Sequence, residues 1–178
     1  ALPIVYIVFQ RLPGRGLAFA KPAGLLVIGY LFWLALSLHI LPNRPGSIVW
    51  VALPIALISL WIVKNHRWKM LDFAQKNTGY IIAIEVVYFF GLLIAAHIRS
   101  FLPDIGGTEK PMDFLFLNAA SRSRYYTPDD PWLSGFGVSY YYFGYVINAM
   151  IGKLAAVPTS VAFNLAVAST AALAATTA

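Results

Sequence analysis

The sequence predicts an all-α integral membrane protein built as a polytopic helical bundle, and composition carries this prediction. The chain has 178 residues, of which 60% are hydrophobic and only 11% are charged, whereas soluble domains carry roughly 25% charged residues. Its mean hydropathy is +0.71. The apolar residues form runs close to the ~20 residues that a helix needs to cross a bilayer core. Because the chain has no cysteine, disulfides and thiolate chemistry are excluded.

Apolar runs separated by short polar stretches predict one transmembrane region over the whole chain. Residues 1–10 are too short to span and are interpreted as the end of a helix. Complete spans are expected over 24–42, 48–63, 79–101, 139–157 and 160–178. Pro54 is expected to kink the second of these spans, and Pro158 separates the last two. Since the sequence begins and stops within apolar runs, we expect it to be part of a longer protein.

The distribution of basic residues predicts how the chain is oriented. Cytoplasmic loops of membrane proteins are enriched in Lys and Arg, and two short segments carry most of them here: Arg11, Arg15, Lys21, Lys64, Arg67, Lys69 and Lys76. We therefore expect 11–21 and 64–78 to be cytoplasmic, the loop 102–138 to lie outside, and Lys153 to sit at the cytoplasmic end of its span. Basic membrane loops account for the net charge of +6 without any nucleic-acid partner.

The loop 102–138 holds the residues most suited to chemistry. Its five acidic and three basic residues give it a net charge of −2. Apolar residues recur at helical spacing over 109–121, which predicts a short helix lying in the membrane interface. Glu109 and Asp113 are four residues apart and share a face of this helix, with Lys110 beside them.

These charged side chains permit two interpretations. Carboxylates at the membrane surface can act as a general base on a hydroxyl acceptor or bind Mg²⁺ or Mn²⁺, while Arg122 and Arg124 can hold a phosphate. The alternative is structural, because acidic residues favour helix N-termini. The pair Asp129 and Asp130, between two prolines, is also typical of turns.

Three consecutive tyrosines, 140–142, open the next apolar run. Tyrosines gather at bilayer interfaces because the ring is apolar and the hydroxyl needs water, so an aromatic belt is the favoured interpretation. Tyr141 and Tyr145 share a helical face and are the candidates for lining a cavity. In the third span, Glu85 is expected to face a partner inside the bundle, because an isolated charge in the membrane is costly.

Three sequence segments carry a resemblance to a known family: GTEKPMDFLFLNA, SRSRYYTPDDPWLSG and YYYFGYVINAMIGKL. They resemble a family of multi-spanning bacterial and archaeal membrane proteins named for its YYY motif. The resemblance covers about 99–165 and extends more loosely upstream. That family is itself similar to C-type glycosyltransferases of the protein O-mannosyltransferase kind, which use lipid-phosphate sugars. The resemblance implies a protein of the prokaryotic plasma membrane that uses a polyprenyl-phosphate-linked sugar as its substrate.

The resemblance also implies roles for individual residues. The first acidic motif falls on Glu109 with Asp113, and the second on Asp129 and Asp130. The first motif of the superfamily usually pairs Asp with Glu, whereas the neighbour of Glu109 here is Lys110. The second motif usually continues with His and Pro, whereas this chain continues with Trp132. The general base is therefore open between Glu109 and Asp113, and a divalent cation stays optional.

Two further functions remain open from sequence alone. The chain can be a non-catalytic membrane subunit that packs against other membrane proteins through the small residues of 160–178. A transporter has weaker support, from Glu85 and Pro54 only. The positions of the loop carboxylates relative to a cavity distinguish the enzyme from the scaffold. An enzyme should gather Glu109, Asp113 and Asp129 around an outward cavity, whereas a scaffold should scatter them into water.

Overall fold

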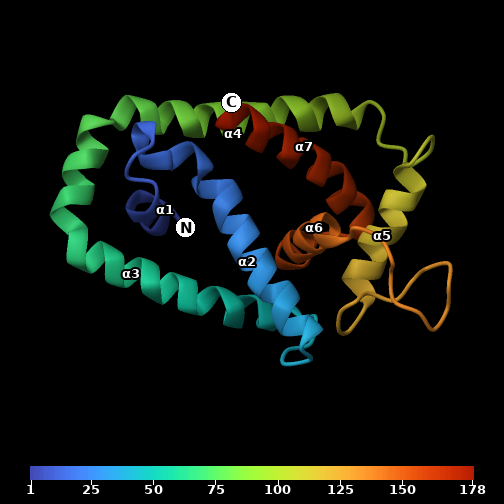
Figure 1. The fold of residues 1–178 in the computed structure, drawn as a ribbon. Helices are drawn as coiled ribbons and strands as arrows, with labels where there is room; N and C mark the ends of the chain where they lie inside the picture. Colours follow the sequence, from blue (N-terminus) through green and yellow to red (C-terminus); the bar gives the residue numbers. More distant parts are fainter.

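The computed structural model describes residues 1–178 and is helical throughout (Figure 1). Its elements are α1 (Leu2–Val8), the 3-10 helix η1 (Pro13–Phe19), α2 (Ala20–Ser37), α3 (Pro45–Lys76), α4 (Thr78–Ser100), α5 (Lys110–Arg122), α6 (Phe143–Leu154) and α7 (Thr159–Thr177). Four segments are long and apolar enough to cross a membrane: Pro13–Ser37, Pro45–Lys76, Thr78–Ser100 and Thr159–Thr177. This confirms the predicted class, a polytopic helical membrane protein.

The crossing helices run between two ends of the molecule, at the right and left of Figure 1. We call the right-hand end the loop side, because it holds the segment 101–142 and the turn 38–44. The left-hand end is the basic side, because the start of α2 and the junction between α3 and α4 lie there with most of the basic residues. Helix α5 lies across the loop side, at an angle to α3 and α4.

Helix α3 is longer than the predicted span 48–63. It runs for 32 residues, or about 48 Å, and takes in most of the basic segment expected to be a loop. Lys, Arg, Met and Gln are good helix formers, so this segment has no residue that ends the helix. The backbone is non-helical at His66 (φ −119°, ψ 16°), while Pro54 lies inside the helix. The bend thus falls at the basic side and not at the proline.

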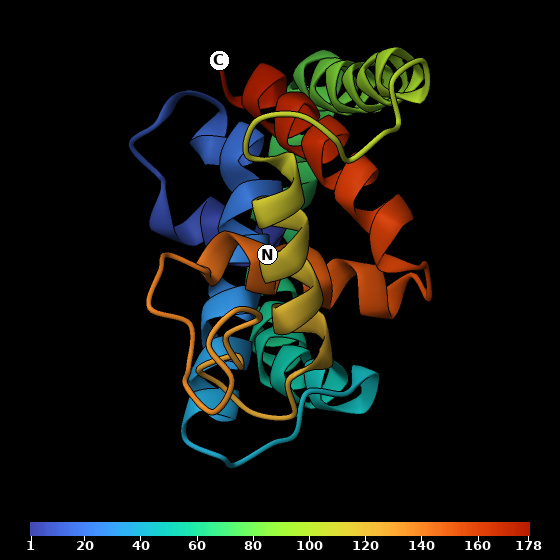
Figure 2. The same ribbon diagram turned by 90° about the vertical axis from the view of Figure 1, so that its right-hand side faces the viewer.

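Helix α6 differs most from expectation, because the predicted span 139–157 contains a helix of only 12 residues, about 18 Å long. In Figure 2, α6 lies across the view, and α7 runs in a different direction from the end of α6. Helix α7 begins on the loop side, where Thr159 Oγ1 donates to Asn118 Oδ1 of α5 at 2.9 Å. The chain therefore enters and leaves α6 on the loop side, and α6 does not connect the two sides as a crossing helix would.

The position of Lys153 follows from this difference in topology. Its Nζ donates to the main-chain oxygen of Asn43 at 3.0 Å, in the turn between α2 and α3 on the loop side. The expectation that Lys153 marks the cytoplasmic end of a span was wrong, since α6 lies across the bundle and does not reach the basic side. Burial lowers the pKa of the Lys153 ammonium.

The hydrophobic core lies on the loop side, where five helices meet. Its ten buried members are Phe32, Leu36, Ile48, Leu117, Ala120, Tyr126, Val146, Ala149, Met150 and Phe163. A polar contact also holds α6 against α2, because Trp33 Nε1 donates to Tyr142 Oη at 3.0 Å. Packing is thus densest around α5 and α6, and this fixes the geometry of the loop side.

Asn43 fastens the end of α5 to this core. The last carbonyls of a helix have no partner within the helix, and the buried Asn43 Nδ2 donates to the oxygens of Ala120 and Ser123, both at 2.8 Å. Tyr126 Oη donates to the same Ala120 oxygen at 2.7 Å. The turn between α2 and α3 therefore caps α5 from a distance of more than seventy residues in the chain.

Candidate functional site

A cavity of about 490 Å³ lies between α5, α6 and α7. We call it the carboxylate cavity; its lining residues are Asp113, Leu117, Tyr145, Asn148, Phe163, Ala166, Val167, Thr170, Ala171 and Ala174. Most of these are apolar, and those of α7 are mainly small. The polar groups come from the first half of α5 and from α6, with Thr170 on α7. One wall is therefore apolar along α7, and a carboxylate stands opposite it.

Asp113 is held by a tyrosine that enters from α6. Tyr145 Oη donates to Asp113 Oδ1 at 2.5 Å. Burial, with the hydrogen bond and charge of Asp113, raises the pKa of Tyr145, so the phenol stays protonated and remains a donor. Asp113 Oδ2 has no hydrogen-bond partner within the protein. This oxygen is free to accept a proton or a hydrogen bond from a ligand.

Phe116 forms the aromatic support behind this pair. Its ring stacks on Tyr140 with centroids 5.1 Å apart and contacts Tyr145 at 5.6 Å. Trp132 meets Phe116 edge-on at 5.5 Å. These contacts join the middle of α5, the loop around Trp132 and the tyrosine segment, which limits how far the Tyr145 ring can move.

Tyr141 does not line the carboxylate cavity with Tyr145. It is 77% exposed and stacks on Tyr140 at 3.9 Å. The shared-face argument fails because α6 begins at Phe143, so Tyr141 precedes the helix. The hydrogen bond from Tyr140 Oη to Tyr141 Oη, 2.5 Å long, is the main cause that raises the pKa of Tyr140 to about 12.

Glu109 and Lys110 stand at the start of α5, near Asp113 but outside the cavity lining. Glu109 is the exposed N-cap residue, and its charge together with that of Asp113 contributes to raising the pKa of Tyr140. Lys110 is half-buried and forms no ion pair. It lies three residues before Asp113, so both side chains share one helical face. Lys110 is the cation nearest to Asp113 in the sequence of α5.

The second acidic motif, Asp129 and Asp130, follows the other end of α5. Both carboxylates accept hydrogen bonds from groups within their own loop. Asp129 Oδ2 accepts a hydrogen bond from Ser123 Oγ at 3.3 Å. Asp130 Oδ1 accepts from the main-chain nitrogens of Trp132 at 2.8 Å and Leu133 at 2.9 Å, which is turn chemistry. The structure does not bring these carboxylates to Asp113, so of the three carboxylates expected around an enzyme's cavity, Glu109, Asp113 and Asp129, only Asp113 lines it.

The two arginines also lie away from Asp113. Arg122 is the exposed last residue of α5, about 13 Å from Asp113 along the helix axis. Arg124 is exposed and its guanidinium lies 5.4 Å from the Tyr125 ring centroid. Lys110 is thus better placed than either arginine to meet a phosphate at the carboxylate cavity.

The donor set beside the carboxylate cavity fits a divalent cation only in part. No group of three or more His, Asp or Glu side chains comes together anywhere in the chain. Glu109 and Asp113 offer two carboxylates, and Mg²⁺ is often bound by one or two carboxylates with substrate phosphates and waters as the remaining ligands. Any such cation would therefore depend on the substrate.

Asn148 is a further polar residue of the carboxylate cavity, and its residue type alone gave it no role in the site. Its Nδ2 donates to the main-chain oxygen of Gly144 within α6 at 3.0 Å, and its side chain lines the cavity. The spacing of Tyr145 and Asn148, three residues apart on α6, is the signal that places both on one face.

The fold and the cavity define a class: a polytopic helical membrane protein with a carboxylate in an apolar cavity on its loop side. Residues 27–178 match a family described as an uncharacterized membrane protein family, DUF2298, and the chain belongs to this family. No curated protein and no solved structure matches the chain.

Proposed function

We propose that this protein transfers a sugar from a polyprenyl-phosphate donor to a hydroxyl acceptor on the loop side, with Asp113 as the general base. One observation carries the proposal: Asp113, held by Tyr145, faces an apolar cavity formed by three helices. The proposal narrows the open choice between two bases, because Asp113 lines the cavity and Glu109 does not.

The cavity suits a substrate that is apolar at one end and polar at the other. Its α7 wall extends from Phe163 to Ala174, about 16 Å along the helix, and is made mainly of apolar side chains. Asp113, Tyr145 and Asn148 supply hydrogen-bonding groups opposite this wall. A lipid chain along α7 would leave the phosphate and sugar beside Asp113.

The proposed reaction forms one bond, breaks one bond and transfers one proton. The acceptor hydroxyl gives its proton to Asp113 Oδ2 while its oxygen forms a bond to C1 of the sugar. The bond between C1 and the phosphate oxygen breaks, and its electron pair leaves with the polyprenyl phosphate. Tyr145 orients the carboxylate through its bond to Oδ1. Lys110 offsets the charge that develops on the phosphate.

The positive-inside rule supports an outward loop side for this reaction. The basic side carries most of the Lys and Arg residues of the short segments, which favours placing it in the cytoplasm of a prokaryotic cell. The donor would then be used on the outer face of the plasma membrane.

The test is turnover of radiolabelled polyprenyl-phosphate sugars by the full-length protein. Asp113→Asn should lower transfer by about 10²- to 10⁴-fold, the contribution typical of a general base. Asp72→Asn is the matched control, because Asp72 forms an exposed ion pair with Lys76 on the basic side and should leave transfer unchanged.

Glu109→Gln separates the two candidate bases in the same assay. We expect a small effect, since Glu109 is exposed at the helix start. A loss with Glu109→Gln and none with Asp113→Asn would move the base to Glu109. No transfer with any donor, together with stable co-purification of a membrane partner, would favour the non-catalytic subunit.

A further inference from the structure

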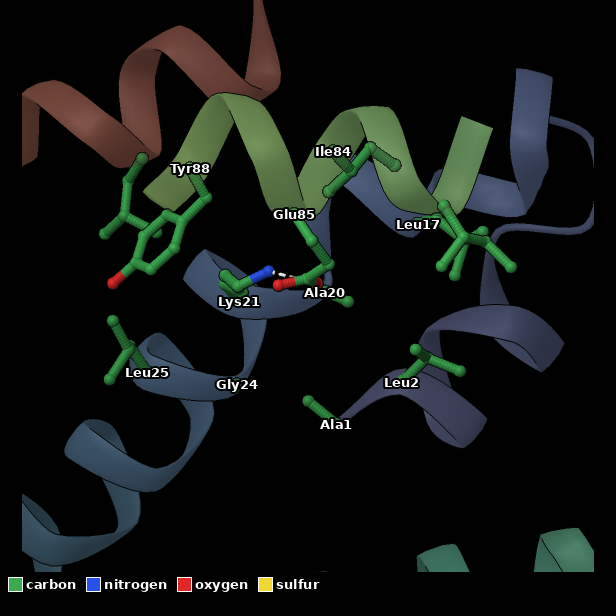
Figure 3. Close-up of a pocket in the computed structure, with 12 residues that line it drawn as sticks. Ala1, Leu2, Leu17, Ala20, Lys21, Gly24, Leu25, Ile84, Glu85 and Tyr88 are labelled. Atoms are coloured by element: carbon green, nitrogen blue, oxygen red, sulfur yellow. Dashed lines mark hydrogen bonds and ion pairs between the residues drawn. The ribbon is translucent and has the colours of Figure 1, made fainter. Parts of the chain in front are cut away.

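A second cavity, of about 470 Å³, lies on the basic side, and Figure 3 shows the residues that line it. We call it the ion-pair cavity; its lining residues are Ala1, Leu2, Leu17, Ala20, Lys21, Gly24, Leu25, Ile81, Ile84, Glu85, Tyr88 and Leu173. They come from α1, η1, α2, α4 and α7, and nine of the twelve are hydrophobic. Nothing in the proposed sugar transfer uses this cavity.

One ion pair joins two walls of the ion-pair cavity. Lys21 Nζ on α2 lies 2.5 Å from Glu85 Oε1 on α4, and Figure 3 shows both side chains turned toward each other. Lys21 Nζ also lies 4.8 Å from the ring centroid of Tyr88. The partner that sequence analysis expected for Glu85 is therefore Lys21.

The ion pair leaves hydrogen-bonding capacity unused. A carboxylate has two oxygens and an ammonium has three N–H donors, but Glu85 and Lys21 share a single contact. The Glu85 side chain keeps 61% of its surface exposed and the Lys21 side chain keeps 29%. Polar groups left unpaired in an apolar membrane environment are costly, so these atoms favour a ligand that supplies both a donor and an acceptor.

Charge balance restricts the ligand further. The charges of Lys21 and Glu85 sum to zero, so an anion gains from Lys21 and is repelled by Glu85. A group with one negative and one positive charge complements both side chains at once. The apolar walls require that the group be attached to hydrocarbon. Both conditions are met by a phospholipid whose headgroup carries a phosphate and an ammonium.

The depth of the ion pair is compatible with a lipid headgroup. Glu85 is the eighth residue of α4, about 10 Å from the helix start on the basic side. Lys side chains extend toward the headgroup layer from such positions. The lipid would come from the leaflet on the basic side, with its acyl chain beside Leu25 and Leu173.

We propose that the ion-pair cavity binds a zwitterionic phospholipid, with the phosphate at Lys21 and the ammonium at Glu85. The ligand inserts one charge next to each side chain and places its apolar chain against the cavity wall. A purely structural ion pair would tie α2 to α4 without preferring any lipid. Lipid selectivity therefore distinguishes the two roles.

The test measures which lipid stays bound to the full-length protein. The purified protein is incubated in detergent with equal amounts of phosphatidylethanolamine and phosphatidylglycerol, and retained lipid is identified by native mass spectrometry. We expect several-fold enrichment of phosphatidylethanolamine. Glu85→Gln leaves Lys21 as a net positive charge and should shift retention toward phosphatidylglycerol.

Three further variants control the result. The exchange Lys21→Glu with Glu85→Lys keeps both charges and should restore the preference for phosphatidylethanolamine. Lys76→Gln removes an exposed ion pair outside the cavity and should change nothing. Leu25→Trp fills the cavity without altering a charge, and it should reduce retained phosphatidylethanolamine. This variant decides the question if Glu85→Gln does not fold.

Two results would overturn the proposal. The first is retention of both lipids in the supplied ratio by the wild type. The second is an unchanged lipid preference in folded Glu85→Gln, with folding verified by thermal unfolding in detergent. Soluble glycerophosphoethanolamine, which lacks acyl chains, should not displace the lipid; displacement would show that the cavity recognises a free headgroup instead.

Discussion

At the residue scale, the proposed chemistry depends on how Asp113 is held. A carboxylate with one oxygen bonded to Tyr145 and the other free is oriented toward the cavity and can still accept a proton or a hydrogen bond. A hydrogen bond to a charged group contributes about 1.5–3 kcal/mol. Tyr145 therefore acts as a positioning residue for Asp113.

Tyr145→Phe should lower the kcat of sugar transfer by about 10- to 100-fold, which is the rate equivalent of one hydrogen bond to a charged group. The change removes the hydroxyl and keeps the ring that packs on Phe116. Transfer kinetics of purified variants measure this, with Tyr141→Phe as the control because Tyr141 lies outside the cavity lining. Equal activity of Tyr145→Phe and wild type would show that Asp113 needs no such orientation.

Asn43→Ala tests the cap at the end of α5. The change leaves buried carbonyl oxygens of Ala120 and Ser123 with fewer donors, so the free energy of unfolding should fall by about 2 kcal/mol. Thermal unfolding in detergent gives the difference. Asn148→Ala serves as the control, since Asn148 bonds only within its own helix. A smaller loss for Asn43→Ala than for this control would contradict the capping role.

At the scale of single elements, the short helix α6, which does not cross the bundle, is the feature with the largest consequence. It returns the chain to the loop side and allows α7 to line the carboxylate cavity beginning at its loop-side end. A full span over 139–157 would have started α7 on the basic side. The contacts of Thr159 and Asn164 with the loop-side residues Asn118 and Pro103 depend on α7 beginning on the loop side.

Cysteine labelling tests this topology directly, because residues 1–178 contain no cysteine that would react in addition. Ala155→Cys lies just after α6 and should react with a membrane-impermeant reagent from the same side as Ser134→Cys in the long loop. Gln75→Cys, near the end of α3, should react only from the opposite side. Labelling of Ala155→Cys together with Gln75→Cys would instead support a helix that crosses the membrane.

Lys153 gives α6 a predictable pH dependence. In the folded protein, burial lowers the pKa of the Lys153 ammonium below its ordinary value of 10.5. Between the lowered value and 10.5 the unfolded chain holds a proton that the folded chain lacks, so stability from this group rises with pH across that window. Lys153→Met should remove the rise, which thermal unfolding of both proteins between pH 7 and pH 10.5 can measure. Parallel pH curves for the two proteins would contradict this assignment.

Local patterns predicted some elements well and others poorly. Hydropathy and helical spacing predicted ranges close to those of α4, α5 and α7, because each depends on residues within one segment. Hydropathy cannot tell a crossing helix from one that turns back, so α6 was expected to be a span. Basic residues were taken for a loop over 64–78, although they are compatible with the continuous helix α3.

At the scale of the whole molecule, contacts distant in sequence decide the site. Asp113 was a candidate from its spacing to Glu109, but its selection depends on Tyr145, thirty-two residues later. Asn43 received no role because its partners are 77 or more residues away. Arg122 and Arg124 were grouped with Asp113 by proximity in the loop, whereas the length of α5 separates them.

The bundle holds two cavities, one toward each side. The carboxylate cavity carries the proposed chemistry on the loop side, and the ion-pair cavity holds a proposed lipid on the basic side. They share α7, which contributes Ala174 to one and Leu173 to the other. Variants in either cavity are therefore best compared in the full-length protein.

The central claim is that the donor lies in the carboxylate cavity with its reacting end at Asp113. The most direct measurement is photo-crosslinking of a polyprenyl phosphate with a photoreactive chain, followed by mass spectrometry of the labelled peptides. We predict labels on α7 between Phe163 and Ala174, and their loss in Ala171→Trp, which narrows the cavity. Labels confined to the loop around Arg124 and Asp129, or unaffected by Ala171→Trp, would contradict the claim.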